Sequence, residues 1–390
     1  MSADWYAGNH YELLENGDEF FPAVIAAIRE AKREVLVESF ILFDDRVGQH
    51  IQATLADAAS RGLTVRLTLD GYGSGELATE FLNEMVNAGV HVHLFDPHAR
   101  LLGLRTHLFR RLHRKLVVID EQVAFVGGIN YSADHLTDDG AQAKQDYSVR
   151  ITGPLCAHIG AAMRQLSSTG PRTRYRPTGT AAPSEEGAGR LIVRDNHRHR
   201  DDIEHAYRAS LRASQSDVLI ANAYFFPGYR LIRDLTRAAR RGVRVRLILQ
   251  GQPDMRIAQF AASMIYDYLL EAGVQIYEYR RRPLHAKVAC FDDEWVTIGS
   301  SNLDPFSLAL NLEANLLARD RSLNQALRDS LSGLLARDCH EITRSADVLR
   351  PVRRMWAAVV VFHVLRWLPA WAGRLPAHKP RVERIRPDES

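Results

Sequence analysis

The stretch HRKLVVIDEQVAFVGGIN, residues 113–130, places a His, a Lys and an Asp ahead of a double glycine and an Asn. A second stretch, HAKVACFDDEWVTIGSSN at 285–302, repeats this arrangement with the same spacing from His to Lys, Asp, Gly and Asn. A single copy is compatible with an exposed strand followed by a turn. Two copies with identical internal spacing predict that the chain is duplicated and that both copies serve one functional site.

The sequence before each copy repeats as well, in the same order. REVLVESFILFDD resembles SDVLIANAYFFPG (33–45 and 216–228), ASRGLTVRLTLDG resembles AARRGVRVRLILQG (59–71 and 238–251), and NAGVHVHLFD resembles EAGVQIYEYR (87–96 and 271–280). Ordered matches of this kind predict two similar halves rather than chance reuse of strand patterns.

Each half alternates helical spacing with apolar runs. In 19–32 the apolar residues recur at helical intervals, a second helix near 47–61 ends at Gly62, and REVLVESFILF and TVRLTL are typical of buried strands. Alternating strands and helices predict an α/β fold whose sheets are covered by helices.

The domain organisation follows from composition. We expect an N-terminal lobe at 1–166, followed by a linker at 167–190 that is rich in Gly, Pro, Ser and Thr. A C-terminal lobe at 191–345 and a C-terminal segment at 346–390 complete the chain.

Bulk composition excludes little. The 390 residues carry a net charge of +3, with 46% apolar and 25% charged residues, as is usual for a globular protein. Three widely spaced cysteines give neither a disulfide framework nor a zinc spacing, which favours a reducing compartment. The polar N-terminus has no pattern of a secretory signal.

The motif residues suit a phosphate site. Alternation along a strand places the His and the Lys of H-x-K on one face, so each half offers an imidazole beside an ammonium group. If the halves meet around a two-fold arrangement, the ammonium and amide groups surround a phosphate, which they can bind by charge and hydrogen bonds. These residues are His113, Lys115 and Asn130 in one half and His285, Lys287 and Asn302 in the other.

Two histidines beside one phosphate can divide the work. One attacks phosphorus, and the other protonates the leaving alcohol and then deprotonates the incoming one. This scheme requires no metal and no cofactor, and the motif contains no acidic cluster of the kind that holds Mg²⁺. A carboxylate usually orients such a histidine, and the candidates are Asp146 and Glu313. Asp120 and Asp292 are either motif members at the site or braces for the Lys or the local backbone.

The paired motifs resemble the signature of the phospholipase D superfamily, two HKD motifs each followed by G-[GS]-x-N. The longer strings GGINYSADH (127–135), AKQDYSVR (143–150), NAYFFPG (222–228), EYRRRPLHAK (278–287) and GSSNLDPFSLALNLEAN (299–315) are similar to bacterial cardiolipin synthases of the short type. The resemblance implies two phospholipase D-type lobes, each a mixed β-sheet flanked by helices, with the active site at the lobe interface.

The resemblance also implies an activity. It implies a phosphatidyltransferase that moves a phosphatidyl group from one phosphatidylglycerol to another and yields cardiolipin and glycerol through a phosphohistidine. By the same resemblance His113 is the nucleophile and His285 the general acid and base, although the near-symmetric copies by themselves permit the reverse. Hydrolysis by a phospholipase D, a nuclease activity and an inactive membrane scaffold are the alternatives. The His-rich NHRHRDD (196–202) suits a solvated helix start better than a metal site.

A lipid substrate requires contact with a bilayer. MWAAVVVFHVLRWLPAWAGRL (355–375) is interrupted by His363, Arg366 and Pro369, which favours an interfacial segment over a spanning helix. The basic runs at 99–115 and 279–287 precede the two motifs and suit anionic lipid better than nucleic acid. We therefore expect phosphatidylglycerol and other anionic lipids as partners, no nucleic acid, and a peripheral location on the cytoplasmic side of a bacterial cell membrane.

Overall fold

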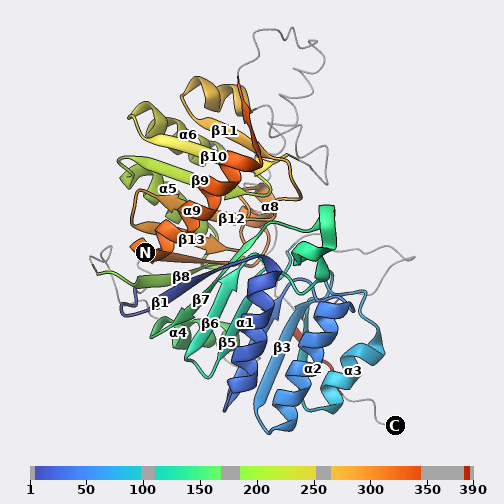
Figure 1. Ribbon diagram of the computed structural model, residues 1–390. Coiled ribbons are helices and arrows are strands. Elements are labelled where there is room, and N and C mark those ends of the chain that lie inside the picture. Colours follow the sequence, from blue (N-terminus) through green and yellow to red (C-terminus); the bar gives the residue numbers. More distant parts are fainter. Residues whose placement is uncertain (1–4, 98–109, 168–184, 252–264, 344–381, 387–390) are drawn as a thin grey trace.

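The computed structural model (Figure 1) describes residues 5–97, 110–167, 185–251, 265–343 and 382–386, and these residues form two mixed β-sheets. Each sheet has eight strands, and helices cover both. The α/β fold with two similar lobes is therefore confirmed.

The N-terminal lobe is built on a sheet of order β1-β7-β6-β5-β2-β3-β4-β16. Its strands are β1 His10–Glu15, β2 Glu34–Ser39, β3 Thr64–Asp70, β4 His91–Phe95, β5 Leu116–Ile119, β6 Val123–Gly127, β7 Tyr147–Thr152 and β16 Val382–Arg384. Its helices are α1 Asn16–Glu30, α2 Arg46–Ser60, α3 Thr79–Asn87, α4 Leu155–Ser167 and the 3₁₀ turns η1 Ala133–His135 and η2 Thr137–Gln142.

The C-terminal lobe is built on a sheet of order β15-β11-β10-β9-β12-β13-β14-β8. Its strands are β8 Ala188–Arg194, β9 Asp217–Asn222, β10 Arg244–Gln250, β11 Gln275–Tyr279, β12 Lys287–Phe291, β13 Trp295–Gly299, β14 Glu313–Arg319 and β15 Cys339–Ile342. Its helices are α5 Asp202–Ala213, α6 Tyr229–Arg240, α8 Pro305–Ala309 and α9 Arg321–Arg337.

The two sheets share one topology. The series β1-β7-β6-β5-β2-β3-β4 corresponds strand for strand to β8-β14-β13-β12-β9-β10-β11. In each lobe the last three strands of this series run parallel, namely β2-β3-β4 and β9-β10-β11, and the motif strand β5 or β12 joins the first of them, β2 or β9, antiparallel. The duplication seen in the sequence is therefore a duplication of the whole lobe.

The chain is layered around the lobe boundary. A central apolar cluster combines residues of both sheets with α4 and α9, while separate clusters fill the space under α1 to α3 and under α5 and α6. Helix α4 contacts β8 of the other lobe, and α9 contacts β1. Because the largest shared core lies between the lobes, their relative placement is fixed by apolar burial.

Local predictions agree with the structure at most ends. The helices expected at 19–32 and 47–61 are α1 and α2, and Gly62 has a φ of 87° just after α2, where glycine has no steric penalty. Residues 188–190, at the end of the expected linker, belong to β8. Residues 382–384 of the expected C-terminal segment pair with β4.

The membrane segment expected at 355–375 lies outside the described residues, as does most of the basic run at 99–115. Within the described ranges, the structure contains no helix with the length and apolar content needed to cross a bilayer.

Candidate active site

The two motif histidines come together at the lobe boundary. Each stands just before its motif strand, beyond the carboxyl end of the parallel strand that the motif strand joins. Two isolated bridges hold these lead-in segments across the boundary, Leu112 with Leu312 and Gln145 with Leu284. In each bridge one residue precedes a motif histidine and the other precedes a carboxylate, so each bridge brings a histidine to a carboxylate of the other lobe.

The histidine–carboxylate pairs are therefore crossed between lobes. His113 Nδ1 lies 3.0 Å from Glu313 Oε2, and His285 Nδ1 lies 2.6 Å from Asp146 Oδ2. Each pair occupies Nδ1 and leaves Nε2 of the imidazole for chemistry. The sequence placed Asp146 and Glu313 as orienting residues after their own motifs, and the structure brings each of them to the histidine of the opposite motif.

Both motif lysines are buried beside these histidines. Lys115 Nζ donates to the carbonyl of His113 at 2.8 Å, and Lys287 Nζ donates to the carbonyl of His285. Burial lowers the pKa of Lys115 to about 7 and that of Lys287 to about 8, although Glu313 and Asp146 oppose the shift. The lowered pKa values show that burying two ammonium groups together is unfavourable. A bound anion would stabilise their charged forms, so the pair is suited to bind one.

Gly128, which follows the first motif, makes room for Asp146, the carboxylate that pairs with His285. A Cβ atom on Gly128 would lie 2.5 Å from Asp146 Oδ1. In the second copy Ser300 takes the equivalent position, and its hydroxyl donates to Glu313 Oε2 at 2.5 Å. The Gly-Gly and Gly-Ser variants of the motif thus serve a shorter and a longer carboxylate.

The two carboxylates differ in charge. Burial raises the pKa of Asp146 to about 7 and outweighs the nearby lysines. Burial also acts on Glu313, but His113, Lys115 and the Ser300 hydroxyl outweigh it and hold the pKa of Glu313 below its usual value. Glu313 therefore stays ionised near neutral pH, whereas Asp146 is partly protonated.

The histidines reflect this difference. Burial lowers the pKa of His113, and Glu313 opposes the shift. The pKa of His285 is held well below its usual value by burial and then by Lys287 and Lys144. Both imidazoles are neutral at pH 7, and the His285 side is the more electropositive.

Two neighbours of the histidines were not singled out in the sequence. The ring of Phe40 lies 5.0 Å from that of His113, and the buried ring of His135 lies 5.4 Å from that of His285. His135 Nε2 accepts from the Asn130 backbone N–H at 3.3 Å. His135 occurs within GGINYSADH, but its place beside the opposite motif depends on the lobe arrangement, which spacing alone does not give.

Among the described residues, His135, Asp146 and His285 bring three potential metal-ligating atoms within 4.8 Å of one another. Lys287 and Lys144 act on the same histidine, and their charge disfavours a cation there. The arrangement suits an anion better than a metal.

Both motif asparagines are almost fully buried. Asn130 is 1% exposed and Asn302 is 5% exposed, and the side-chain oxygen of each has no partner among the described residues. Both were expected to bind the phosphate. An unpartnered amide oxygen in a buried site leaves the amide available to a ligand hydroxyl or a water.

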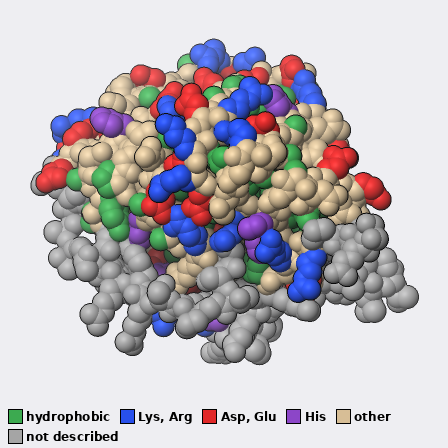
Figure 2. Space-filling model, turned by 90° about the horizontal axis from the view of Figure 1, so that it is seen from below, with side chains coloured by type: hydrophobic (Ala, Val, Ile, Leu, Met, Phe, Trp, Pro, Cys, Tyr) green, Lys and Arg blue, Asp and Glu red, His purple; other side chains and the backbone are tan. Residues whose placement is uncertain are grey.

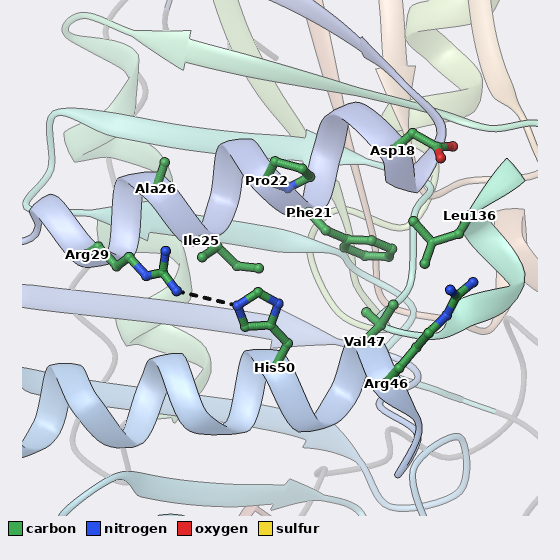
Figure 3. A pocket seen from close by; sticks show the side chains of 10 residues that line it. All are labelled: Asp18, Phe21, Pro22, Ile25, Ala26, Arg29, Arg46, Val47, His50 and Leu136. Atoms are coloured by element: carbon green, nitrogen blue, oxygen red, sulfur yellow. Dashed lines mark hydrogen bonds between the residues drawn. The ribbon is translucent and has the colours of Figure 1, made fainter. Parts of the chain in front are cut away.

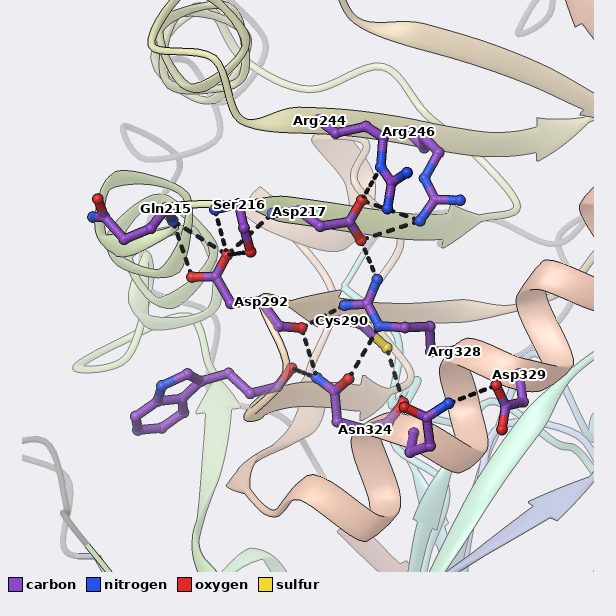
Figure 4. Close-up of polar contacts among 12 residues, drawn as sticks. Gln215, Ser216, Asp217, Arg244, Arg246, Cys290, Asp292, Asn324, Arg328 and Asp329 are labelled. Carbon is purple, nitrogen blue, oxygen red and sulfur yellow. Dashed lines mark hydrogen bonds and ion pairs between the residues drawn. The ribbon is translucent and has the colours of Figure 1, made fainter.

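The motif aspartates lie away from the histidines, at the far ends of the motif strands. Asp120 accepts from the backbone N–H groups of Lys32, Arg33 and Glu34, each at 2.8 Å. Asp292 likewise accepts from three successive backbone N–H groups, those of residues 215–217 (Figure 4). Of the two roles left open for these aspartates, the contacts agree with bracing of the backbone and not with direct chemistry.

The aspartates therefore fix the start of the neighbouring strand. Burial alone would raise the pKa values of Asp120 and Asp292, but hydrogen bonds from backbone N–H groups outweigh it and lower both pKa values. Beside Asp292, the carboxylate of Asp217 pairs with Arg244, Arg246 and Arg328 (Figure 4). Because β5 and β12 connect these braces to the histidines, the aspartates position the site from a distance of about 20 Å, given about 3.3 Å per strand residue.

A cavity of about 510 Å³ lies between α1 and α2 (Figure 3). Its walls are mainly apolar, including Phe21, Ile25 and Val47, with Arg29 and His50 joined by a hydrogen bond of 3.5 Å. Neither motif histidine lines it, so it is separate from the candidate active site.

Known proteins agree with this architecture. The family described as "Cardiolipin synthase, PLD-like domain" matches residues 24–161 and 207–335. Cardiolipin synthase B of Salmonella typhi is 50% identical over 395 residues, which cover 99% of this chain and 95% of that protein. Cardiolipin synthase B of Escherichia coli K12 is 48% identical with the same coverage. The cardiolipin synthase of Geobacillus kaustophilus is 32% identical over 332 residues, covering 82% of this chain and 65% of that protein.

Solved structures share the fold at low sequence identity. Phosphatidylserine synthase of Haemophilus influenzae superimposes with a TM-score of 0.70 at 15% identity, covering 92% of this chain and 95% of that one. Polyphosphate kinase of Porphyromonas gingivalis gives a TM-score of 0.59 at 17% identity and covers 93% of this chain and 53% of that one. Such distant similarity identifies the two-lobed fold and not the substrate.

Proposed function

Because this chain belongs to the family of cardiolipin synthases with phospholipase D-like domains, we propose that it joins two phosphatidylglycerols through a covalent histidine intermediate. It is a phosphatidyltransferase of the cardiolipin synthase type, with phospholipids as substrates. The observation that carries the proposed mechanism is the crossed pairing of His113 with Glu313 and of His285 with Asp146 around two buried lysines.

In the first half-reaction His113 is the nucleophile. Its Nε2 attacks phosphorus of the donor lipid, the bond from phosphorus to the glycerol oxygen breaks, and a nitrogen–phosphorus bond forms. The positive charge that develops on the imidazole is stabilised by Glu313, which stays ionised 3.0 Å from Nδ1. This ionised partner supports His113, rather than His285, as the nucleophile.

His285 supplies the proton that the departing glycerol oxygen needs. In the substrate-free site its pKa is low, with burial as the largest cause and Lys287 next. A bound phosphodiester anion offsets the lysine charge, which raises the pKa of His285 and allows it to carry that proton. Binding of the correct substrate thus prepares the acid.

In the second half-reaction His285 is the general base. It takes the proton of the acceptor hydroxyl, the hydroxyl oxygen attacks phosphorus, and the nitrogen–phosphorus bond to His113 breaks. The products are cardiolipin and the two histidines in their starting forms. Because two in-line displacements follow one another, configuration at phosphorus is retained.

The lysines and asparagines hold the phosphate through both steps. Lys115 and Lys287 neutralise charge on the non-bridging oxygens, and the amides of Asn130 and Asn302 add hydrogen bonds. All four side chains are at least nine-tenths buried, so water competes poorly for these contacts.

We propose peripheral contact with the bacterial cell membrane, on its cytoplasmic side. Phe43 and Tyr229 support this contact, because they are 38% and 47% exposed and lie beside or at the first turn of α2 and α6. Both positions follow the carboxyl ends of parallel strands, the same edge at which the histidines lie. Exposed aromatic rings at such an edge suit the headgroup region of a bilayer.

The face in Figure 2 intersperses Lys and Arg with Asp and Glu side chains. A track of phosphates favours a continuous basic surface, and the described part of this face does not present one.

The test uses purified protein, phosphatidylglycerol liposomes and no added divalent metal, with products identified by mass spectrometry. Cardiolipin with an equal amount of free glycerol supports the proposal, and His113→Ala should abolish both. Phosphatidic acid as the sole product would assign the acceptor role to water and replace transfer with hydrolysis. Retained activity in a folded His113→Ala variant would exclude the phosphohistidine on that residue.

A further inference from the structure

A second cavity, of about 400 Å³, lies at the lobe boundary next to the His285 side of the site. The 3₁₀ turn η2 forms one wall with Thr137, Gly140 and Ala141, and the loop before the second motif forms the other with Arg281 and Arg282. This rim pocket, as we call it, thus has one wall from each lobe. Its lining is part polar and part apolar, and among the described residues the two arginines are the charged groups that line it.

The charge of the rim pocket is incompletely balanced by the protein. Arg282 donates to the Gln145 side-chain oxygen and, at 3.3 Å, to the Tyr279 hydroxyl, both neutral groups. Arg281 is 66% exposed, and its nearest carboxylate among the described residues is Asp338, at 3.7 Å. Two guanidinium groups with few carboxylate partners facing one polar cavity are suited to bind an anion, and phosphate matches their geometry.

Gln145 connects the rim pocket to the catalytic histidine. Its backbone carbonyl accepts from the His285 N–H at 2.8 Å, and its N–H donates to the Pro283 carbonyl at 2.8 Å. Its side chain, held by Arg282, also donates to Glu15 at 2.7 Å. An anion bound at Arg281 and Arg282 therefore lies a few residues from the group that activates the acceptor hydroxyl.

The other half of the site lacks this arrangement. The position equivalent to Gln145 is Leu312, which is 4% exposed and belongs to a small apolar cluster with Phe95 and Leu112. No polar side chain at that position can hold an arginine toward the His113 lead-in. Among the residues that the structure describes, the anionic subsite is therefore expected on the His285 side, which is the side where the acceptor is activated in the proposed mechanism.

We propose that the rim pocket binds the phosphate of the acceptor lipid, with Arg281 and Arg282 as its ligands. This inference rests on the proposed function and adds to it a basis for acceptor choice. The acceptor phosphatidylglycerol carries its own phosphodiester three carbons from the hydroxyl that attacks. Binding that phosphate orients the hydroxyl toward His285, an advantage that water and free glycerol lack.

The experiment compares a charged acceptor with a neutral one at the same reaction centre. Liposomes supply a labelled phosphatidylglycerol donor, and either unlabelled phosphatidylglycerol or ethanol serves as the acceptor, so that cardiolipin and phosphatidylethanol report the two transfers. The variants are Arg281→Gln and Arg282→Gln. The matched control is Arg280→Gln, from the same run of arginines, because Arg280 pairs with Glu278 at 2.8 Å and does not line the pocket.

Arg281→Gln should lower the ratio of cardiolipin to phosphatidylethanol about tenfold, as expected for loss of one charge-assisted contact. Phosphatidylethanol formation should stay at the wild-type rate, and Arg280→Gln should match wild type in both products. Arg282→Gln should lower the same ratio at least as much. Its rate of phosphatidylethanol formation reports separately whether the Gln145–His285 segment has moved.

An unchanged ratio in both pocket variants would overturn the inference while leaving the proposed function intact. Equal loss of both products in Arg281→Gln would overturn it too, because the arginine would then serve the donor or the membrane. Wild-type protein that forms phosphatidylethanol but no cardiolipin would instead overturn the proposed function.

Discussion

The His113 half and the His285 half of the site have the same backbone and different surroundings. His113 meets an ionised glutamate that a serine hydroxyl supports, with Phe40 beside its ring. His285 meets a partly protonated aspartate beside a glycine, with His135 next to its ring. The duplication supplied two equivalent histidines, and the residues around them differ in the charge and hydrogen bonds that they offer, which is the basis for the proposed division of tasks.

The difference extends below the site. In the N-terminal lobe the buried side chains of Glu38 and Arg114 lie 3.9 Å apart, and burial raises the pKa of Glu38 to about 7 against the effect of Arg114. The equivalent positions in the C-terminal lobe are Ala221 and Ala286, both in the shared core. The same pair of positions therefore holds an ion pair in one lobe and two alanines in the other, so the repeated backbone requires neither.

Removing each histidine in turn tests the division of tasks most strongly. His113→Ala should lower cardiolipin synthesis by at least about 10⁴-fold, the scale of losing a nucleophile. His285→Ala should lower it by about 10²- to 10⁴-fold. With a phosphatidyl nitrophenyl ester, whose leaving group needs no proton, His285→Ala should release one nitrophenol per protein and retain the phosphatidyl group. Intact-protein mass spectrometry detects that adduct, and an adduct in His113→Ala instead would reverse the roles.

Replacing the two carboxylates tests whether their charges differ. Glu313→Gln removes an ionised partner and should lower the rate about 10³- to 10⁴-fold. Asp146→Asn removes a group that is already partly neutral and should lower it about 10²-fold or less. Rates with the natural lipid and thermal unfolding curves are measured for both variants. Equal losses at equal stability would mean that the two pairs work alike.

The pH dependence of phosphate binding tests the buried lysines. The pKa values of Lys115 and Lys287 are lowered to about 7 and about 8, so both are charged below these values and lose charge as pH rises. The affinity for a soluble glycerol phosphodiester should fall about tenfold between about pH 6.5 and 9, because the ligand charge stays constant. Calorimetry measures this, and Lys115→Gln should leave only the step near pH 8. An affinity independent of pH in the wild type contradicts the lowered values.

The smallest effect is expected at the far ends of the motif strands. Asp120→Asn and Asp292→Asn should each lower the free energy of unfolding by about 1–2 kcal/mol, through lost bonds to backbone N–H groups. Both carboxyls have lowered pKa values, so their contribution is present above the unfolded pKa and is lost as pH falls through the folded one. Denaturant unfolding at neutral and acid pH checks this. Stability unchanged at neutral pH, with activity lost, would place the aspartates in the chemistry.

Much of the fold could be predicted because repeats and apolar periodicity are local signals. The helix ending at Gly62 and the buried run at β2 follow from spacing along one segment. The pairing of residues 382–384 with β4 in the first lobe could not be predicted, because no local pattern in the sequence indicates it. The pairing of a C-terminal strand with the first lobe depends on which sheet edge is available to it in the folded chain.

The sequence by itself determined that the chain is duplicated, and it predicted that His113, Lys115, His285 and Lys287 form one phosphate-binding set, because spacing and residue chemistry are encoded locally. Only the tertiary structure decided that Glu313 serves His113 and that Asp146 serves His285. It also placed His135 beside the opposite motif and the aspartates Asp120 and Asp292 away from the histidines. These pairings arise where two lobes bury a shared core, and contacts between residues more than a hundred positions apart leave no periodic pattern in either segment.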